Sequence, residues 1–195
     1  MSACDWFMKN EERKAYHEEW GTPVHDDRKQ FEILSLEVMQ CGLNFGLILQ
    51  KRPLLRRCFE EFDVEKVAQY GASYEKRILE TPGMIRSGRK IRAIIQNARA
   101  LQKVREEEGS FSAYLWSFTQ GKSLIYPDHA IQTPPTSNAL SVRICKDLKK
   151  RGFCFIGPVV IYSHLEACGV INDHGAECPR RQWLLDHYPT ICGEE

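Results

Sequence analysis

The apolar residues of this chain recur at helical spacing over nearly its whole length, and this pattern limits the fold to one built of packed helices. The clearest stretch shows the i, i+3, i+7 pattern at four positions, Phe31, Leu34, Val38 and Cys41. Asp26 or Asp27 can cap this helix, and Gly42 can end it. No segment shows the alternation expected of a strand, so we predict an all-α fold in a single domain spanning residues 1–195.

Further helices are expected on both sides of one long loop. Asp63 precedes a short helix, and Ser73 precedes another. A long basic amphipathic helix follows and ends near Gly109. Residues 120–136 contain one glycine and three prolines, so we expect them to form a crossing loop.

A glycine-bounded turn joins two predicted helices in the C-terminal third. Thr136 or Ser137 can cap the first helix, which stops at Gly152. After Gly157, Pro158 suits the first position of the second helix. Three basic residues precede the turn, Lys149, Lys150 and Arg151. Glycine allows close approach of a phosphate and the helix start offers N–H donors, so the unit is a candidate phosphate grip; a plain turn between packed helices is the alternative.

The charges of the chain are segregated rather than abundant. Lys and Arg number 27 against 26 Asp and Glu, and this net charge of +1 gives no bulk attraction to nucleic acid. Residues 76–105, however, hold nine basic residues and one acidic, and residues 143–151 hold five basic and one acidic. Such runs can place a basic face on a neutral protein and grip a phosphate backbone, although solvated helix faces are the simpler interpretation.

No stretch approaches the ~18 consecutive apolar residues of a membrane span, and the N-terminus lacks the basic and apolar regions of a secretory signal. We therefore expect a cytoplasmic monomer with no membrane partner. In that compartment the eight cysteines are core residues or metal ligands rather than disulfides.

Two of the cysteines lie close to histidines in polar, irregular segments. Cys4 and His17 stand near one end with twelve residues between them, and His174 and Cys178 stand near the other with three between them. Two thiolates and two imidazoles make a full tetrahedral set for a structural zinc. The half-sites are far apart and contain no CxxC pair, so the spacing alone leaves zinc binding and ordinary packing equally open.

Six short motifs carry a family resemblance: Ala15-Tyr16-His17, Glu19-Trp20-Gly21, Pro135-Thr136-Ser137, Asp147-Leu148-Lys149-Lys150-Arg151-Gly152-Phe153, Phe155-Ile156-Gly157-Pro158 and Val170-Ile171-Asn172-Asp173-His174. Together they resemble the DNA-3-methyladenine glycosylase I family, the constitutive bacterial glycosylases of the helix-hairpin-helix superfamily. The resemblance covers residues 1 to about 178 and leaves 179–195 as a tail.

The resemblance implies a helix-hairpin-helix DNA glycosylase fold in which a zinc ion joins the two ends of the chain. Its four ligands are expected to be Cys4, His17, His174 and Cys178, which leave no open position and make the zinc structural. The implied activity is a hydrolase that flips alkylated adenine out of double-stranded DNA and cleaves its N-glycosidic bond. Free 3-methyladenine is then the product, and an abasic site remains.

The same resemblance assigns the site residues. Glu37 reads the adenine edge and Tyr16 donates a hydrogen bond, as the two catalytic residues. The substrate pocket is expected to be lined by Trp6, Trp20, Phe45 and Arg13. Gly42 and Leu43 are expected to wedge into the duplex. The phosphate contacts are expected from Lys149, Lys150, Arg151, Gly152 and Gly157.

Three positions depart from the family pattern. Phe45 replaces the tryptophan that stacks on the base, Arg13 stands where a tyrosine is common, and Val38 replaces a small residue. These changes keep open a non-catalytic or altered-specificity relative that binds DNA or a nucleobase, and a zinc-stapled interaction module is a third interpretation. Asp173 is either an acid that stabilises charge on the sugar or a partner that orients His174.

Overall fold

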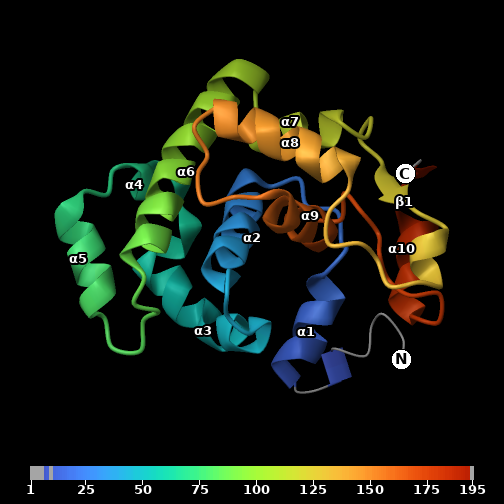
Figure 1. Cartoon of the computed structure of the whole chain (residues 1–195), viewed down its shortest axis with the longest axis horizontal. Coiled ribbons are helices and arrows are strands. Elements are labelled where there is room, and N and C mark those ends of the chain that lie inside the picture. The colour runs from blue at the N-terminus through green and yellow to red at the C-terminus, as the bar shows by residue number, and fades with distance from the viewer. Residues whose placement is uncertain (1–6, 9–10, 194–195) are drawn as a thin grey trace.

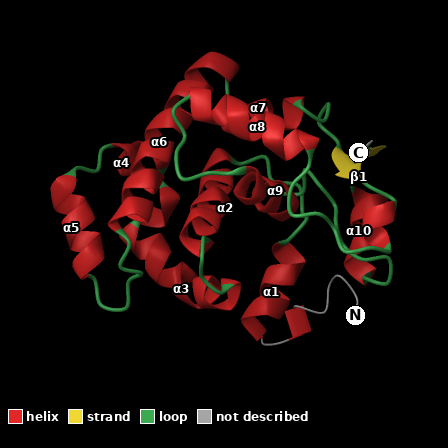
Figure 2. Cartoon of the chain, in the orientation of Figure 1, coloured by secondary structure: helices red, strands yellow, loops and turns green. Residues whose placement is uncertain are grey.

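A computed structural model describes residues 7–8 and 11–193 of the chain. This part of the chain forms ten α-helices and one sheet of two short strands (Figure 1, Figure 2), so the predicted helical architecture is confirmed in outline. The helices are α1 (Glu11–Glu19), α2 (Asp27–Gln40), α3 (Phe45–Cys58), α4 (Val64–Ala68), α5 (Ala72–Glu80), α6 (Gly88–Glu108), α7 (Phe111–Ser117), α8 (Ala139–Lys150), α9 (Pro158–Ala167) and α10 (Pro179–His187). The remaining elements are η2 (Glu60–Phe62), η3 (Asp128–Ala130), β1 (Ser123–Ile125) and β2 (Thr190–Cys192).

Helix α2 lies at the centre of the molecule (Figure 1). All of its residues from Gln30 to Met39 are buried, because α3, α6, α7 and α9 pack around it. A helix enclosed on all sides must bury even its polar positions, which then need partners. Gln30, for example, donates a hydrogen bond to the Val24 carbonyl at 2.8 Å. The two acids in this stretch, Glu32 and Glu37, are therefore placed in the interior.

Two predicted helix starts are confirmed. The Asp26 carboxylate accepts a hydrogen bond from the Lys29 amide at 2.7 Å and caps α2, and Asp63 caps α4 in the same way. Asp27 instead accepts hydrogen bonds from the amides of Phe111 and Ser112, at 3.1 and 2.8 Å, at the start of α7.

Two other predicted starts are wrong. Helix α5 begins at Ala72 after Gly71, so Ser73 lies inside the helix. Helix α8 is capped by Asn138, which forms a reciprocal pair of hydrogen bonds with Ser141, rather than by a residue at 136 or 137. The capping box satisfies two orphan amides at once, and this advantage decides between neighbouring polar residues.

The prediction of an entirely α fold with a plain loop at 120–136 is also wrong in detail. Strand β1 pairs in parallel with β2, and Leu124 exchanges backbone hydrogen bonds with Val170 and Asn172 at 2.8 and 2.9 Å. Each strand has only three residues, too few to show alternation in the sequence. The pairing brings the C-terminal end of the described chain against the crossing segment.

The predicted tail also contains a helix that docks on the first helix. Helices α1 and α10, blue and red in Figure 1, lie on the same side of the molecule. Arg180 donates hydrogen bonds to the Glu18 carbonyl at 2.8 Å and to the Thr22 hydroxyl at 2.7 Å. Gly169, just after α9, packs so closely on the segment after α1 that a Cβ would lie 2.6 Å from the Pro23 nitrogen. The segment after α1 thus contacts both α10 and the end of α9.

No helix in the described part of the chain is both long enough and apolar enough to cross a membrane.

Candidate base pocket, metal cluster and nucleic-acid interface

A pocket of about 220 Å³ opens where α1, α2, α3 and α9 meet. Its lining residues are Arg13, Tyr16, Trp20, Glu37, Gln40, Phe45, Ser163 and Glu166. Five of these were predicted from the sequence as catalytic or substrate-binding residues, and the structure brings all five together. Trp6 lies outside the described residues. Val38 is fully buried in the core and is not one of the residues that line the pocket.

Glu37 is the acid that α2 carries into this pocket. Its side chain belongs to the buried centre of the helix, and only 6% of the residue is exposed. Burial raises the pKa of Glu37 from 4.5 to about 8, because desolvation disfavours the carboxylate. In the empty pocket at neutral pH the carboxyl therefore holds a proton.

Tyr16 lies beside Glu37 on the neighbouring helix. Burial and then the charge of Glu37 raise the pKa of Tyr16 well above its ordinary value, so its hydroxyl keeps its proton and can donate a hydrogen bond. The Phe45 ring meets the Tyr16 ring edge-on, with centroids 5.0 Å apart. The pocket thus presents aromatic rings next to a donor and an acid.

An ion network fixes α1, which carries Tyr16, against α2 and α3. The Arg52 guanidinium donates hydrogen bonds to Glu32 on α2 at 2.8 Å and to Glu19 on α1 at 2.9 Å. Burial alone would raise the pKa of Glu32, but hydrogen bonds from Arg56 and Arg52 outweigh burial and lower that pKa to about 2. The network therefore stays ionised at neutral pH and holds one wall of the pocket.

Sequence reasoning missed two pocket residues on α9, Ser163 and Glu166. They lie three positions apart and so share one face of the helix. Glu166 forms a side-chain hydrogen bond with Asp173, and its pKa is raised well above the ordinary value by burial and by the charges of Asp173 and Glu37. An acid in the largely apolar run 159–168 was the one signal available.

Asp173 lies in the interior behind the pocket. Its Oδ2 accepts a hydrogen bond from the Tyr162 hydroxyl at 2.5 Å, and its Oδ1 lies 2.8 Å from His129 Nδ1. His174, which Asp173 orients in one of the two interpretations above, has its Nε2 3.1 Å from the Trp20 carbonyl. Neither His129 nor Tyr162 could be identified as a partner of Asp173 from the sequence.

Three of the four predicted metal ligands form a buried cluster. The ligand atoms of His17, His174 and Cys178 all lie within 4.8 Å of one another. The Cys178 sulfur is 3.4 Å from His17 Nε2 and 3.4 Å from His174 Nδ1. Burial lowers the pKa of both histidines, that of His174 to about 3, so both imidazoles are neutral, which is the form that binds a metal. Cys4 lies outside the described residues.

The cluster is directly connected to the pocket. His17 follows Tyr16 on α1, and the Trp20 ring contacts the His174 ring with centroids 4.6 Å apart. Interactions that stabilise the cluster therefore also help to position Tyr16 and Trp20 in the wall of the pocket.

The turn between α2 and α3 stands next to the pocket. Gly42 has φ +74°, a conformation that favours glycine, and the Leu43 side chain at the tip is 37% exposed. Asn44 then caps α3 by accepting a hydrogen bond from the Gly46 amide at 2.8 Å. An exposed leucine on a tight turn has the form expected of a duplex wedge.

The hairpin between α8 and α9 has the predicted shape, with Pro158 at the first position of α9 and Gly157 before it. Lys149 and Lys150 are exposed. Arg151, in contrast, forms ion pairs with Asp147, Glu107 and Glu108, and only 21% of its side chain is exposed. The expectation that Arg151 is open to phosphates therefore disagrees with the structure.

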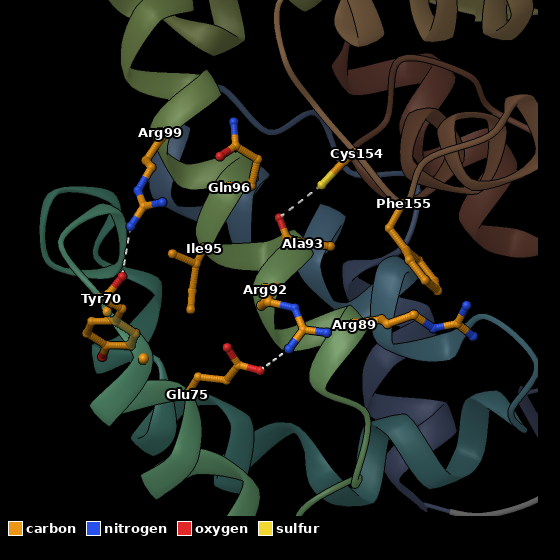
Figure 3. Close-up of a pocket in the computed structure, with 12 residues that line it drawn as sticks. Tyr70, Glu75, Arg89, Arg92, Ala93, Ile95, Gln96, Arg99, Cys154 and Phe155 are labelled. Atoms are coloured by element: carbon orange, nitrogen blue, oxygen red, sulfur yellow. Dashed lines mark hydrogen bonds and ion pairs between the residues drawn. The ribbon is translucent and has the colours of Figure 1, made fainter.

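A second hollow of about 510 Å³ lies beside this hairpin, between α5 and α6 (Figure 3). Arg92 pairs with Glu75, and Arg99 donates hydrogen bonds to the Ala68 and Tyr70 carbonyls at 2.8 Å each. The Arg89 side chain forms no hydrogen bond or ion pair within the described chain, and it lies on the same side as Phe155 of the hairpin (Figure 3). It is a cation free to meet a phosphate.

Comparisons with known proteins agree with this geometry. The model of the methyladenine glycosylase family matches residues 6–182. The chain is 38% identical over 179 residues to DNA-3-methyladenine glycosylase 1 of Escherichia coli K12, covering 91% of this chain and 96% of that one. A crystal structure of 3-methyladenine DNA glycosylase I has 41% identity and a TM-score of 0.85, covering 90% of this chain and 97% of that chain. A variant of such an enzyme in complex with 3-methyladenine has 33% identity and a TM-score of 0.86, covering 93% and 98%.

Proposed function

The chain belongs to the methyladenine glycosylase family, and we propose that its pocket receives the base during catalysis. It is a DNA-3-methyladenine glycosylase, which hydrolyses the N-glycosidic bond of 3-methyladenine in DNA. The observation that carries the assignment of the pocket is the meeting of Glu37, Tyr16 and Phe45 in one cavity.

Glu37 gives the pocket a preference for a cationic base. Adenine alkylated at N3 carries a positive charge while it is attached to the sugar, whereas ordinary adenine is neutral. Burial makes ionised Glu37 unfavourable in the empty pocket, and a cation beside it offsets that cost. The alkylated base therefore replaces the proton of Glu37 when it binds. Below about pH 8 binding releases one proton, so affinity for the cation rises with pH up to that point.

The other charged and titratable groups around Glu37 are consistent with this role. Tyr16 remains a neutral donor, and Glu166 adds a second acid on the far wall. Arg13 is tied to Asn44, whose Oδ1 accepts a hydrogen bond from its guanidinium at 3.1 Å. The cleavage itself needs little assistance, because the base leaves as a neutral molecule.

Free 3-methyladenine tests the pocket without DNA. We expect its addition to shift the NMR signals of Tyr16, Glu37 and Phe45, because these residues line the cavity. Signals around Arg92, in the second hollow, serve as the control and should stay unchanged. Shifts confined to surface residues outside the pocket would contradict the assignment.

Phe45→Trp should tighten binding of free 3-methyladenine by a fraction of the ~1–3 kcal/mol that stacking of a base contributes.

We propose that duplex DNA lies across the turn and the hairpin. Leu43 fills the gap left by the extruded base, and Gly152 and Gly157 let the backbone approach the amides at the start of α9. Lys149 and Lys150 add positive charge there, and Arg89 extends the basic surface between hairpin and turn. The proposed partners are double-stranded DNA and the free base; a monomeric, cytoplasmic protein remains a prediction from sequence.

Neutralising Lys149 and Lys150 tests the proposed contacts with DNA phosphates. Lys149→Gln with Lys150→Gln should weaken binding to any duplex sequence and flatten the slope of log K against log salt by about 1 to 2. Lys66→Gln with Lys103→Gln removes the same charge from other exposed sites and should change little. Arg151→Gln should leave the slope nearly unchanged, because its charge is already paired. An unaltered slope in the Lys149 and Lys150 double variant would exclude the hairpin as a contact.

We propose that the buried cluster binds a structural zinc ion. His17, His174 and Cys178 supply three ligands with suitable chemistry, and Cys4 is the fourth ligand implied by the resemblance. The ion would hold α1 in place and, with it, Tyr16.

A further inference from the structure

The turn that carries Leu43 is held by a side chain from a distant helix. Lys90, in the first turn of α6, donates hydrogen bonds to the backbone carbonyls of Met39 at 2.7 Å and Cys41 at 2.6 Å. These carbonyls lie at the end of α2, where the last C=O groups have no partner within the helix. The ammonium also lies at the negative end of the helix dipole. A cation therefore occupies the point where α2 stops and the turn begins.

The burial of Lys90 is unusual for its segment. The eight other basic residues between positions 76 and 105 are exposed, whereas Lys90 is 7% exposed. Burial lowers the pKa of Lys90, because desolvation disfavours the ammonium. An apolar side chain would fill this space without that cost, so the two hydrogen bonds are the reason a lysine is suited to the position.

The other side of the turn is fixed independently. The Asn44 side chain caps α3, and Arg13 donates a hydrogen bond to the same oxygen. Gly42 and Leu43 are exposed between these two anchors. The structure thus presents an exposed leucine on a turn whose two ends are both anchored.

We propose that Lys90 is a positioning residue for base extrusion, holding Gly42 and Leu43 in the conformation that enters the duplex. This inference rests on the proposed wedge role of Leu43. A turn that is already ordered loses less conformational entropy on insertion than a mobile one. Displacement of a positioned group by about 1 Å is enough to slow a reaction by up to about 100-fold.

The test compares a reaction that needs the turn with one that does not. Lys90→Met should lower kcat/KM for release of 3-methyladenine from alkylated duplex DNA about tenfold. Affinity for free 3-methyladenine should stay within about twofold, because that ligand needs only the pocket. Lys103→Met, at an exposed position of the same helix, should alter neither quantity.

A double-mutant cycle identifies the path of the effect. If Lys90 acts through the turn, Leu43→Ala should reduce duplex activity in the wild type but add little in the Lys90→Met background. Gly42→Ala provides a second route, since its Cβ would meet nothing within 4 Å and only the left-handed backbone is disfavoured. Gly42→Ala should therefore lower activity on duplex DNA and leave affinity for free 3-methyladenine unchanged, as expected for Lys90→Met. This variant tests the role of the turn even if Lys90→Met does not fold.

Independent, multiplying losses for Lys90 and Leu43 would overturn the proposal. So would an equal loss of free-base affinity, which would show a general structural role. If Gly42→Ala had full duplex activity, the conformation of the turn would not matter and the inference would also be wrong. Failure of the proposed function is distinguishable, because the unmutated protein would then release no 3-methyladenine.

Discussion

Glu37→Gln will slow the release of 3-methyladenine from duplex DNA by about 10- to 100-fold, the expected effect of losing a hydrogen-bonded charge. Glutamine has the shape of a protonated glutamate, so the empty pocket should be unchanged. It cannot become an anion when the cationic base binds, however, and the preference for that base is lost. General affinity for undamaged duplex should persist, because Leu43 and the hairpin are untouched.

The same substitution will stabilise the fold at neutral and alkaline pH. The folded-state pKa of Glu37 is raised from 4.5 to about 8. The free energy of unfolding is therefore highest below pH 4.5, where Glu37 is protonated in both the folded and the unfolded state. It falls as pH rises from 4.5 through 8, because the unfolded state releases the proton first. At pH 7 the loss amounts to on the order of 3 kcal/mol, and glutamine avoids it. Denaturant unfolding at pH 5, 7 and 8.5 measures the difference.

A matched control is Glu106→Gln, an exposed acid on α6. It should change neither stability nor base release. If Glu37→Gln shows the same free energy of unfolding as the wild type at every pH, Glu37 is not buried as described. Retention of full activity would remove it from the catalytic residues.

Removing the proposed zinc ion will destabilise the protein by several kcal/mol, on the scale of structural zinc sites. The cluster joins His17 to Cys178, 161 positions apart, and closing so long a loop removes much entropy from the unfolded chain. One zinc ion per chain should copurify, and His174→Ala should lose it. Elemental analysis and thermal unfolding with and without a chelator measure both effects.

Cys192→Ser is the control for the metal, because Cys192 is an exposed thiol on β2 outside the cluster. It should bind zinc and unfold like the wild type. Loss of metal should also weaken binding of free 3-methyladenine, since His17 neighbours Tyr16. A protein without stoichiometric metal that is as stable as the zinc form would refute the assignment.

Most of the helical fold could be predicted from local signals, and the failures have local causes. Asp26, Asp63 and Gly109 mark helix ends by capping chemistry that acts within a few residues. The start of α8 was wrong because several polar residues stand side by side there and only the reciprocal bonds of Asn138 distinguish them. The short sheet could not be predicted, because its pairing depends on segments far apart in the chain.

The site was partly predictable for a related reason. Glu37 was found through the family resemblance, and the structure puts it beside Tyr16. Glu166 and Lys90 were missed because their roles depend on long-range contacts, with Asp173 and with the end of α2. Arg151 was misjudged because its acidic partners at 107 and 108 lie far away in sequence.

The most direct test of the central claim is chromatography of the bases released from duplex DNA treated with a methylating agent. The account predicts that the unmutated protein releases 3-methyladenine in a time-dependent manner and leaves an equal number of abasic sites. Glu37→Gln protein of the same fold should release it far more slowly. Release no greater than in the enzyme-free control, from protein that is folded and metal-loaded, would contradict the account.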